Sequence, residues 1–172
     1  YQNFPMFSAN TIVTMKNLSY LNKRGYDVTL VFPGRGDNKI SESDILDFYN
    51  IKEKIKIERT RYLLPFGKIN IFNKSSFRIS HFFWSFIIWI KYFFKEIDKK
   101  NTVLITRSNW ILYFFSKSKL SIIYECHKFS KLTHLIFRAV KGKGNCAFTF
   151  TNELLKDSFK LSAIQKKNSI VV

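Results

Sequence analysis

The sequence predicts an α/β fold, in which a doubly wound parallel β-sheet is built from strands that alternate with helices. The first indication is the alternation itself, because short runs of β-forming residues are separated by helical segments throughout the second half of the chain. The second is a glycine that ends the first helix and directly precedes a strand. The third is size, since 172 residues, 46% of them hydrophobic, are sufficient for one domain with its own core.

The first helix and strand form half of a β-α-β unit. Thr11 to Arg24 has apolar residues at helical spacing, and Gly25 follows as the residue after the helix C-cap. Tyr26 to Phe32 is rich in β-forming residues and is expected to end in a turn at Pro33. Since parallel strands are joined through helices, a further strand is expected before Tyr1, so the domain is predicted to be truncated at this end.

The next region is expected to contain one short strand and one long helix. No regular element is predicted in the polar stretch from Asp37 to Glu53, whereas Lys54 to Arg59 alternates like a strand near a sheet edge. Ser76 to Ile97 is predicted to be a long helix, apolar on nearly all sides. Three placements are open for it: packed within the protein, docked also on a membrane surface, or spanning a membrane. A span is the least favoured, because the apolar run from Phe82 to Phe94 is shorter than about 20 residues and contains a lysine.

The second half of the chain has the most regular pattern. Strands are expected at Val103–Thr106, Ser121–Tyr124, Cys146–Thr149 and Ser169–Val172. The helices between them are expected at Asn109–Ser116, Leu132–Val140 and Asn152–Leu161. Because the chain stops on an apolar strand, residues 1–172 are interpreted as one partial domain, truncated at both ends.

The chain is strongly basic. Lysine and arginine total 29 against 12 acidic residues, which gives a formal charge of +17. Such a surplus favours an anionic partner, namely nucleic acid, membrane lipid or a phosphorylated substrate. AT-rich codons, which favour Lys together with Asn, Ile, Phe and Tyr, explain the lysine content equally well. The charge by itself therefore does not choose a function.

Cysteine content and motifs argue against several classes of protein. Cys126 and Cys146 form no CxxC pair and no zinc-ligand set, so a reducing compartment and no structural metal are expected. The first residues lack the pattern of a signal peptide. No GxGxxG, GxxxxGK[ST], GxSxG or HExxH motif occurs, which leaves dinucleotide-binding, P-loop, hydrolase and zinc-protease functions without support.

Polar residues follow three of the predicted strands, at the edge where α/β proteins bind their ligands. His127 is the strongest candidate for a catalytic residue, because it follows a short buried strand and its imidazole exchanges protons near neutral pH. Glu125 shares a face of the extended chain with His127, and it either orients the imidazole or points away from it. The alternative is a histidine that only hydrogen-bonds a loop. His81 and His134 lie in helical patterns and are interpreted as structural.

The residues at the other two strand ends are candidates for substrate binding. Arg107 and Ser108 end a strand, where they are expected to hold phosphate or sugar oxygens, to cap the next helix, or both. Asn152 and Glu153 begin a helix, for which capping alone is the stronger explanation. No metal ligand is assigned.

Ser8 and Asn10 are further candidates for substrate binding. They belong to the loop Phe4–Asn10, which would join the absent first strand to the first helix. Many α/β proteins place backbone N–H groups against phosphate in such a loop, although this one contains no glycine.

Four segments resemble the amino-terminal half of GT-B glycosyltransferases, in particular the retaining enzymes grouped as family 4. They are SANTIVTMKNLSYLNKRGYDVTLVFP, like the family's first helix and second strand; VLITRS, like its yxRs strand end; IIYECHK, like its E-x-H segment; and FTFTNELLKDSF, like its iTxxLkxxl segment. Their order and spacing fit the family over nearly the whole chain.

The resemblance implies a Rossmann-like domain that mainly binds the acceptor and faces a second domain holding a nucleotide-sugar. The implied enzyme is a hexosyltransferase that transfers a sugar from this donor to a glycan or glycolipid acceptor, with no other cofactor in this chain. In the family, the histidine matching His127 lies beside the transferred sugar, and the loop matching Phe4–Asn10 lies near the donor phosphates or the acceptor. The family's first strand, its glycine-containing first loop and the donor-binding half are missing, so this chain alone is expected to be inactive.

A second hypothesis is a basic α/β module that binds nucleic acid or an anionic membrane without catalysis. Nucleic acid is disfavoured, because the aromatic residues cluster in one apolar helix and no RRM, KH or zinc-finger signature is present. A non-enzymatic scaffold with a degenerate cleft is a third hypothesis. The leading hypothesis is a cytoplasmic transferase. Peripheral association with the inner membrane face is left open, and if it occurs, the contact is expected around Trp84 and Trp89.

Overall fold

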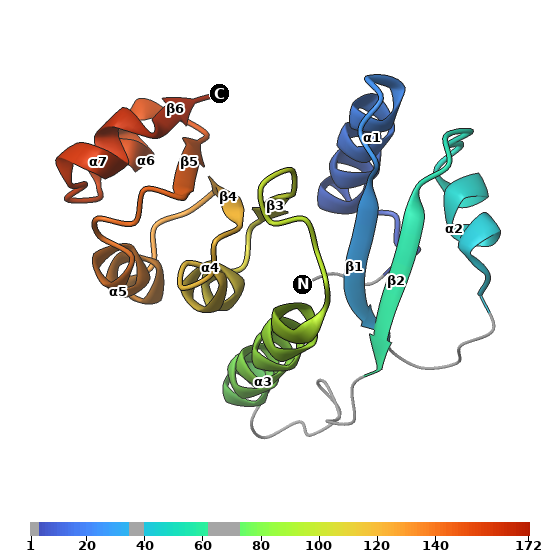
Figure 1. Ribbon diagram of the computed structural model, residues 1–172, viewed down its shortest axis with the longest axis horizontal. Coiled ribbons are helices and arrows are strands. Elements are labelled where there is room, and N and C mark those ends of the chain that lie inside the picture. The colour runs from blue at the N-terminus through green and yellow to red at the C-terminus, as the bar shows by residue number, and fades with distance from the viewer. Residues whose placement is uncertain (1–3, 35–39, 62–72) are drawn as a thin grey trace. The chain divides into compact units, whose positions relative to one another are not determined.

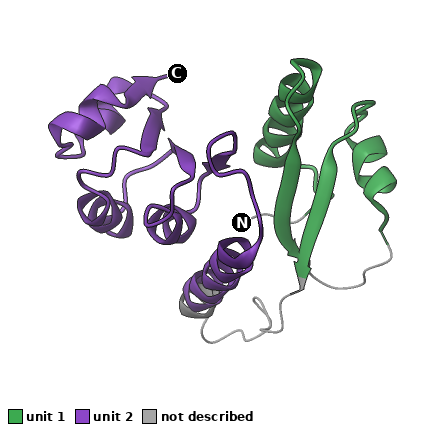
Figure 2. Cartoon of the chain, viewed as in Figure 1, with its two compact units in different colours: residues 1–65 green, residues 66–172 purple. Residues whose placement is uncertain are grey.

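The computed structural model describes residues 4–34, 40–61 and 73–172, which fall into two compact units (Figure 2). Unit 1 runs from Tyr1 to Pro65 and unit 2 from Phe66 to Val172. Helices and strands alternate along both units, and every strand pairing in the described residues is parallel. The α/β class with parallel strands, predicted from the sequence, is therefore confirmed.

Unit 1 contains two helices and a two-stranded sheet (Figure 1). α1 (Ala9–Lys23) leads through Gly25, whose φ of 87° suits a residue without Cβ, into β1 (Thr29–Gly34). α2 (Glu42–Phe48) and β2 (Lys56–Arg61) follow, and β2 pairs with β1.

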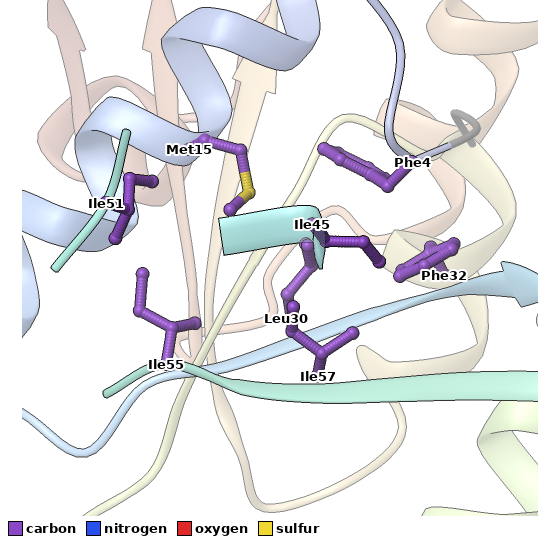
Figure 3. Close-up of a cluster of buried hydrophobic side chains, with 8 residues drawn as sticks. All are labelled: Phe4, Met15, Leu30, Phe32, Ile45, Ile51, Ile55 and Ile57. Atoms are coloured by element: carbon purple, nitrogen blue, oxygen red, sulfur yellow. The ribbon is translucent and has the colours of Figure 1, made fainter. Parts of the chain in front are cut away.

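One apolar cluster holds unit 1 together (Figure 3). α1 contributes Met15 and α2 contributes Ile45, both completely buried. Leu30 and Phe32 of β1 and Ile57 of β2 form the sheet side of the cluster. Burying a side chain of this size stabilises a fold by about 1.5–3 kcal/mol, so these contacts are sufficient to fix both helices on the sheet.

Two sequence-based expectations for unit 1 are wrong. α2 lies inside the stretch in which no regular element was expected, and a capping box starts it. The Ser41 hydroxyl accepts a hydrogen bond from the Asp44 backbone N–H at 3.0 Å, and the Asp44 carboxylate accepts one from the Ser41 N–H at 2.7 Å. The strand also does not stop before Pro33, because β1 continues through it, paired with Thr60. An edge strand tolerates proline, since one side of its backbone needs no donor.

Unit 2 contains a four-stranded parallel sheet in the order β3-β4-β5-β6. The strands are β3 (Val103–Thr106), β4 (Ser121–Cys126), β5 (Cys146–Phe150) and β6 (Ser169–Val171). The helices are α3 (Asn73–Phe94), α4 (Asn109–Phe115), α5 (Lys131–Ala139), α6 (Glu153–Asp157) and α7 (Ala163–Lys167). The helix expected over Asn152–Leu161 ends early, at Asp157, and a further capping box, Ser162 with Gln165, starts α7.

The two faces of this sheet differ in burial. Tyr124 and Phe148 point to a fully buried face, on which the ring of Phe137 from α5 packs 4.8 Å from that of Phe148. Ile105 and Glu125 lie on the opposite face, which is partly open to solvent. The carboxylate of Glu125 therefore faces the more accessible side of the sheet.

α3 is the long helix expected from the sequence, and it packs along α4. Phe82 lies 4.9 Å from Trp110 and Phe86 lies 5.5 Å from Phe114, measured between ring centroids. Packing within the protein is therefore confirmed for one side of the helix. Among the residues that the structure describes, no helix is long and apolar enough to cross a membrane.

Candidate functional site

Arg107, Glu125 and His127 come together where β3 and β4 end. The two strands are adjacent and parallel, with Thr106 in register with Tyr124, so their carboxyl ends meet at one edge of the sheet. Arg107 Nε donates a hydrogen bond of 2.5 Å to Glu125 Oε2. His127 Nε2 lies 3.7 Å from the same oxygen. Glu125 and His127 lie on the same side of the chain, as expected for an extended segment, although β4 extends to Cys126 and Glu125 lies inside the strand rather than after it.

The three side chains differ in how firmly they are held. Arg107 and Glu125 are 26% and 25% exposed and joined by a charge-assisted hydrogen bond. His127 is 46% exposed, and its distance from the carboxylate exceeds that of a hydrogen bond. Glu125 therefore attracts the imidazole electrostatically when His127 is protonated. Within the described part of the chain, no acceptor contacts the terminal guanidinium nitrogens of Arg107.

This arrangement presents two chemical functions to solvent. The free edge of the Arg107 guanidinium donates hydrogen bonds in a planar fork, which suits phosphate, carboxylate or sugar oxygens. The His127 imidazole donates, accepts or transfers a proton. Cys126 takes no part, because its side chain lies on the buried face and burial raises the pKa of its thiol to about 11.

A hydrogen-bonded chain behind the site ties β4 to the first turns of two helices. The Tyr124 hydroxyl donates to Asn109 Oδ1 at 2.5 Å, Asn109 Nδ2 donates to Thr133 Oγ1 at 3.2 Å, and Thr133 Oγ1 shares a 2.6 Å hydrogen bond with Ser130 Oγ. Burial raises the pKa of Tyr124 well above its usual value, so its hydroxyl remains a donor. Sequence reasoning did not single out Tyr124 or Asn109. The only signal for Tyr124 was a hydroxyl two residues before the end of β4.

The side chain of Ser108 makes two hydrogen bonds within the fold. Its Oγ accepts a hydrogen bond of 3.2 Å from the Ile111 N–H and so caps α4. The same Oγ shares a 2.8 Å hydrogen bond with Nε2 of His81 on α3. Burial lowers the pKa of His81 to about 3, so its imidazole is neutral near pH 7. The capping explanation for Ser108 and the structural interpretation of His81 are both confirmed.

Asn152 and Glu153 are engaged locally at the end of β5. Asn152 Oδ1 accepts a hydrogen bond of 2.7 Å from the Leu155 N–H and caps α6. Glu153 lies 3.3 Å from Lys156 Nζ, one turn along the same helix. The capping explanation is therefore confirmed for Asn152.

Ser8 and Asn10 lie at the start of α1 in unit 1. Ser8 caps this helix through a hydrogen bond of 3.3 Å between its Oγ and the Thr11 N–H. Asn10 is exposed, and its backbone carbonyl accepts a hydrogen bond of 2.8 Å from the Thr14 hydroxyl. Their expected contact with phosphate stays a prediction.

The chain is a parallel α/β protein, and its guanidinium, carboxylate and imidazole lie at the sheet edge where proteins of this class generally bind their ligands. The chain matches a family model described as Glycosyl transferase 4-like over residues 6–139, and it belongs to that family. Arg107, Glu125 and His127 all lie within the matched region, which ends before β5. Membership supports a glycosyltransferase-type function. Comparison with curated proteins and with solved structures gives no match.

Proposed function

We propose that this chain is the acceptor-side, Rossmann-like domain of a retaining GT-B glycosyltransferase. The enzyme transfers a hexose from a nucleotide-sugar to a glycan or lipid-linked acceptor in the cytoplasm, together with a separate donor-binding domain. The observation that supports this most directly is the cluster of Arg107, Glu125 and His127 at one sheet edge, within the region that matches the family. No metal and no cofactor beyond the nucleotide-sugar are part of the proposal.

His127 is the residue proposed to act beside the transferred sugar. Its imidazole is accessible, and Glu125 on one side favours an orientation in which the other ring nitrogen faces the ligand. When the sugar–phosphate bond breaks, its electron pair leaves with the diphosphate, and the acceptor hydroxyl gives its proton to the departing diphosphate oxygen as the new glycosidic bond forms. A hydrogen bond or proton from the imidazole stabilises the charge that develops in this step.

Arg107 is proposed to bind oxygens of the acceptor or of the donor phosphates. Its Nε is already fixed by Glu125, so the guanidinium plane is held in one orientation before substrate arrives. Preorganised donors of this kind cost no rearrangement at the moment of reaction.

The test is a donor and acceptor screen with the full-length protein, in which release of nucleoside diphosphate is measured for a panel of nucleotide-sugars. Turnover of at least one donor, dependent on a glycan or glycolipid acceptor, supports the proposal. No turnover of any donor, together with RNA binding that weakens steeply with salt, would instead support a nucleic-acid binding module.

A further inference from the structure

We propose that the outer side of α3 is a docking surface for an anionic phospholipid bilayer. This surface, called the α3 stripe below, consists of large apolar side chains that the fold leaves exposed. They are Ile79, Phe83, Phe86, Ile87, Ile90 and Phe94. The inference does not rest on the proposed transfer reaction, because it concerns a surface outside the Arg107 and His127 cluster.

The α3 stripe is continuous along the helix. Its members follow the spacing i, i+4, i+7, i+8, i+11 and i+15, which places them on one side of an α-helix. Their exposure ranges from 37% at Phe86 and Ile90 to 81% at Phe94. An apolar surface of this length on a folded domain marks an interaction site, because isolated exposed hydrophobic residues do not line up in this way.

Most of the α3 stripe is exposed, and Phe86, at its border, also packs on Phe114 of α4. Trp84 and Ile88, which are 5% and 4% exposed, lie on the opposite side of the helix. Trp84, around which membrane contact was left open, is therefore not part of the exposed surface. Trp89 lies at the border, half-buried, with its ring 5.8 Å from Phe86 and 6.0 Å from Phe114.

Charge complementarity indicates the occupant. Exposed Lys91 lies on the last turn of α3, exposed Lys95 directly follows the helix, and the end of the helix borders a recess of about 500 Å³. Lys99, Lys100 and Lys119 also line this recess, where Glu96 and Asp98 are the acidic members. Five lysines against two acids leave a positive surface beside the apolar one. An apolar helix face bordered by lysines fits the boundary between lipid tails and anionic headgroups.

Two lysines also make cation–π contacts with aromatic rings at this end of α3. Lys99 Nζ lies 5.8 Å from the centroid of Phe93, and Lys95 Nζ lies 5.1 Å from that of Tyr92. Cationic and aromatic groups are therefore placed side by side at the level where headgroups meet acyl chains.

The first test measures co-sedimentation of the chain with phosphatidylcholine vesicles, with and without phosphatidylglycerol. Wild-type protein is expected to bind the anionic vesicles and to bind the neutral ones more weakly. Replacing Ile87→Asp together with Ile90→Asp is expected to weaken binding about tenfold or more, because two charges then face the acyl chains. The matched control is Leu135→Asp with Ile164→Asp, at side chains 58% and 44% exposed on α5 and α7, which is expected to bind like wild type.

The second test separates charge from apolar contact. Lys100→Gln with Lys119→Gln is expected to weaken binding to anionic vesicles on the order of tenfold, because each lysine near the surface adds to the attraction. Lys141→Gln with Lys143→Gln removes the same charge from an exposed loop elsewhere and is expected to have a smaller effect.

The third test reads insertion directly. Ile90→Cys is labelled with an environment-sensitive nitrobenzoxadiazole dye, which spares Cys126 and Cys146 because both are buried and burial raises their thiol pKa to about 11. A blue shift with anionic vesicles is expected at this position and not with Leu135→Cys. No shift, or equal binding by the aspartate variant and wild type, would overturn the proposal. A dimer that dissociates in the aspartate variant, with vesicle binding unchanged, would assign the α3 stripe to a second copy of the chain and also overturn it.

Discussion

The ends of β4 and β5 carry similar polar sequences, but the two strand ends use them differently. At β4, Glu125 accepts a hydrogen bond from Arg107 of the neighbouring strand end, and His127 lies beside the same carboxylate. At β5, the side chains of Asn152 and Glu153 are both bound within the first turns of α6.

The difference arises from which residue after each strand caps the next helix. α6 begins directly after β5, so its first N–H groups need Asn152 as their cap. α5 begins only at Lys131, and Ser130 provides its cap with a hydrogen bond of 3.0 Å to the Thr133 N–H. His127 therefore has no capping role. In the same way Ser108 caps α4 and leaves Arg107 available. A polar strand end is a candidate ligand site when another residue supplies the cap.

The largest expected effect is that of His127→Ala on transfer by the full-length protein. Loss of a proton donor or acceptor at the reacting sugar is expected to lower kcat about 100-fold or more. The fold is expected to stay intact, because this side chain is 46% exposed. Turnover is measured under saturating donor and acceptor, with circular dichroism as the control. Unchanged turnover in a folded variant would contradict the proposal that the end of β4, unlike the end of β5, acts in transfer.

The second prediction tests Ser108 and His81 as parts of the fold. Burial lowers the pKa of His81 in the folded chain to about 3, so between that pH and about 6.5 the unfolded chain binds the additional proton. The contribution of neutral His81 to the free energy of unfolding is therefore complete above about pH 6.5. It is lost as the pH falls towards 3, by up to about 1.4 kcal/mol per pH unit. Urea unfolding at several pH values measures the slope. His81→Gln is expected to flatten it, and an unchanged slope in this variant would show that another group causes the dependence.

The third prediction concerns the cap at β5. Asn152→Ala is expected to reduce the free energy of unfolding by about 1 kcal/mol, because the Leu155 N–H loses its acceptor. Asn152→Ser keeps a capping oxygen and is the matched control. Transfer is expected to change by less than about twofold once the folded fraction is corrected for. A loss of transfer as large as that of His127→Ala would place the start of α6 in the site.

The smallest effect is expected for Glu153→Gln. The Glu153 side chain is 66% exposed, and its ion pair with Lys156 spans one helical turn. Such pairs contribute only a few tenths of a kcal/mol, so thermal unfolding is expected to change little. A large change in the unfolding temperature would indicate that this carboxylate has a further partner.

Local patterns in the sequence were sufficient for most helices and strands. β3, the start of α4 and the start of β4 agree with the sequence-based boundaries, because short β-forming runs there are bounded by polar residues. α2 was missed, since its one buried residue, Ile45, leaves too weak a periodic signal. The capping box from Ser41 to Asp44 was the signal that identifies it.

The amino-acid sequence alone therefore specified the parallel α/β class and the polar strand ends, because periodicity and capping act over a few residues. The pairing of strands into sheets depends on contacts between residues far apart in the sequence, so only the tertiary structure shows which strands are neighbours. The described strands form sheets of two and of four, and β3 lies beside β4, which brings Arg107 to Glu125 across 18 residues. Tertiary structure likewise determined that Trp84 and Ile88 lie on the buried side of α3, because a helix apolar on nearly all sides has no preferred inner face in its sequence.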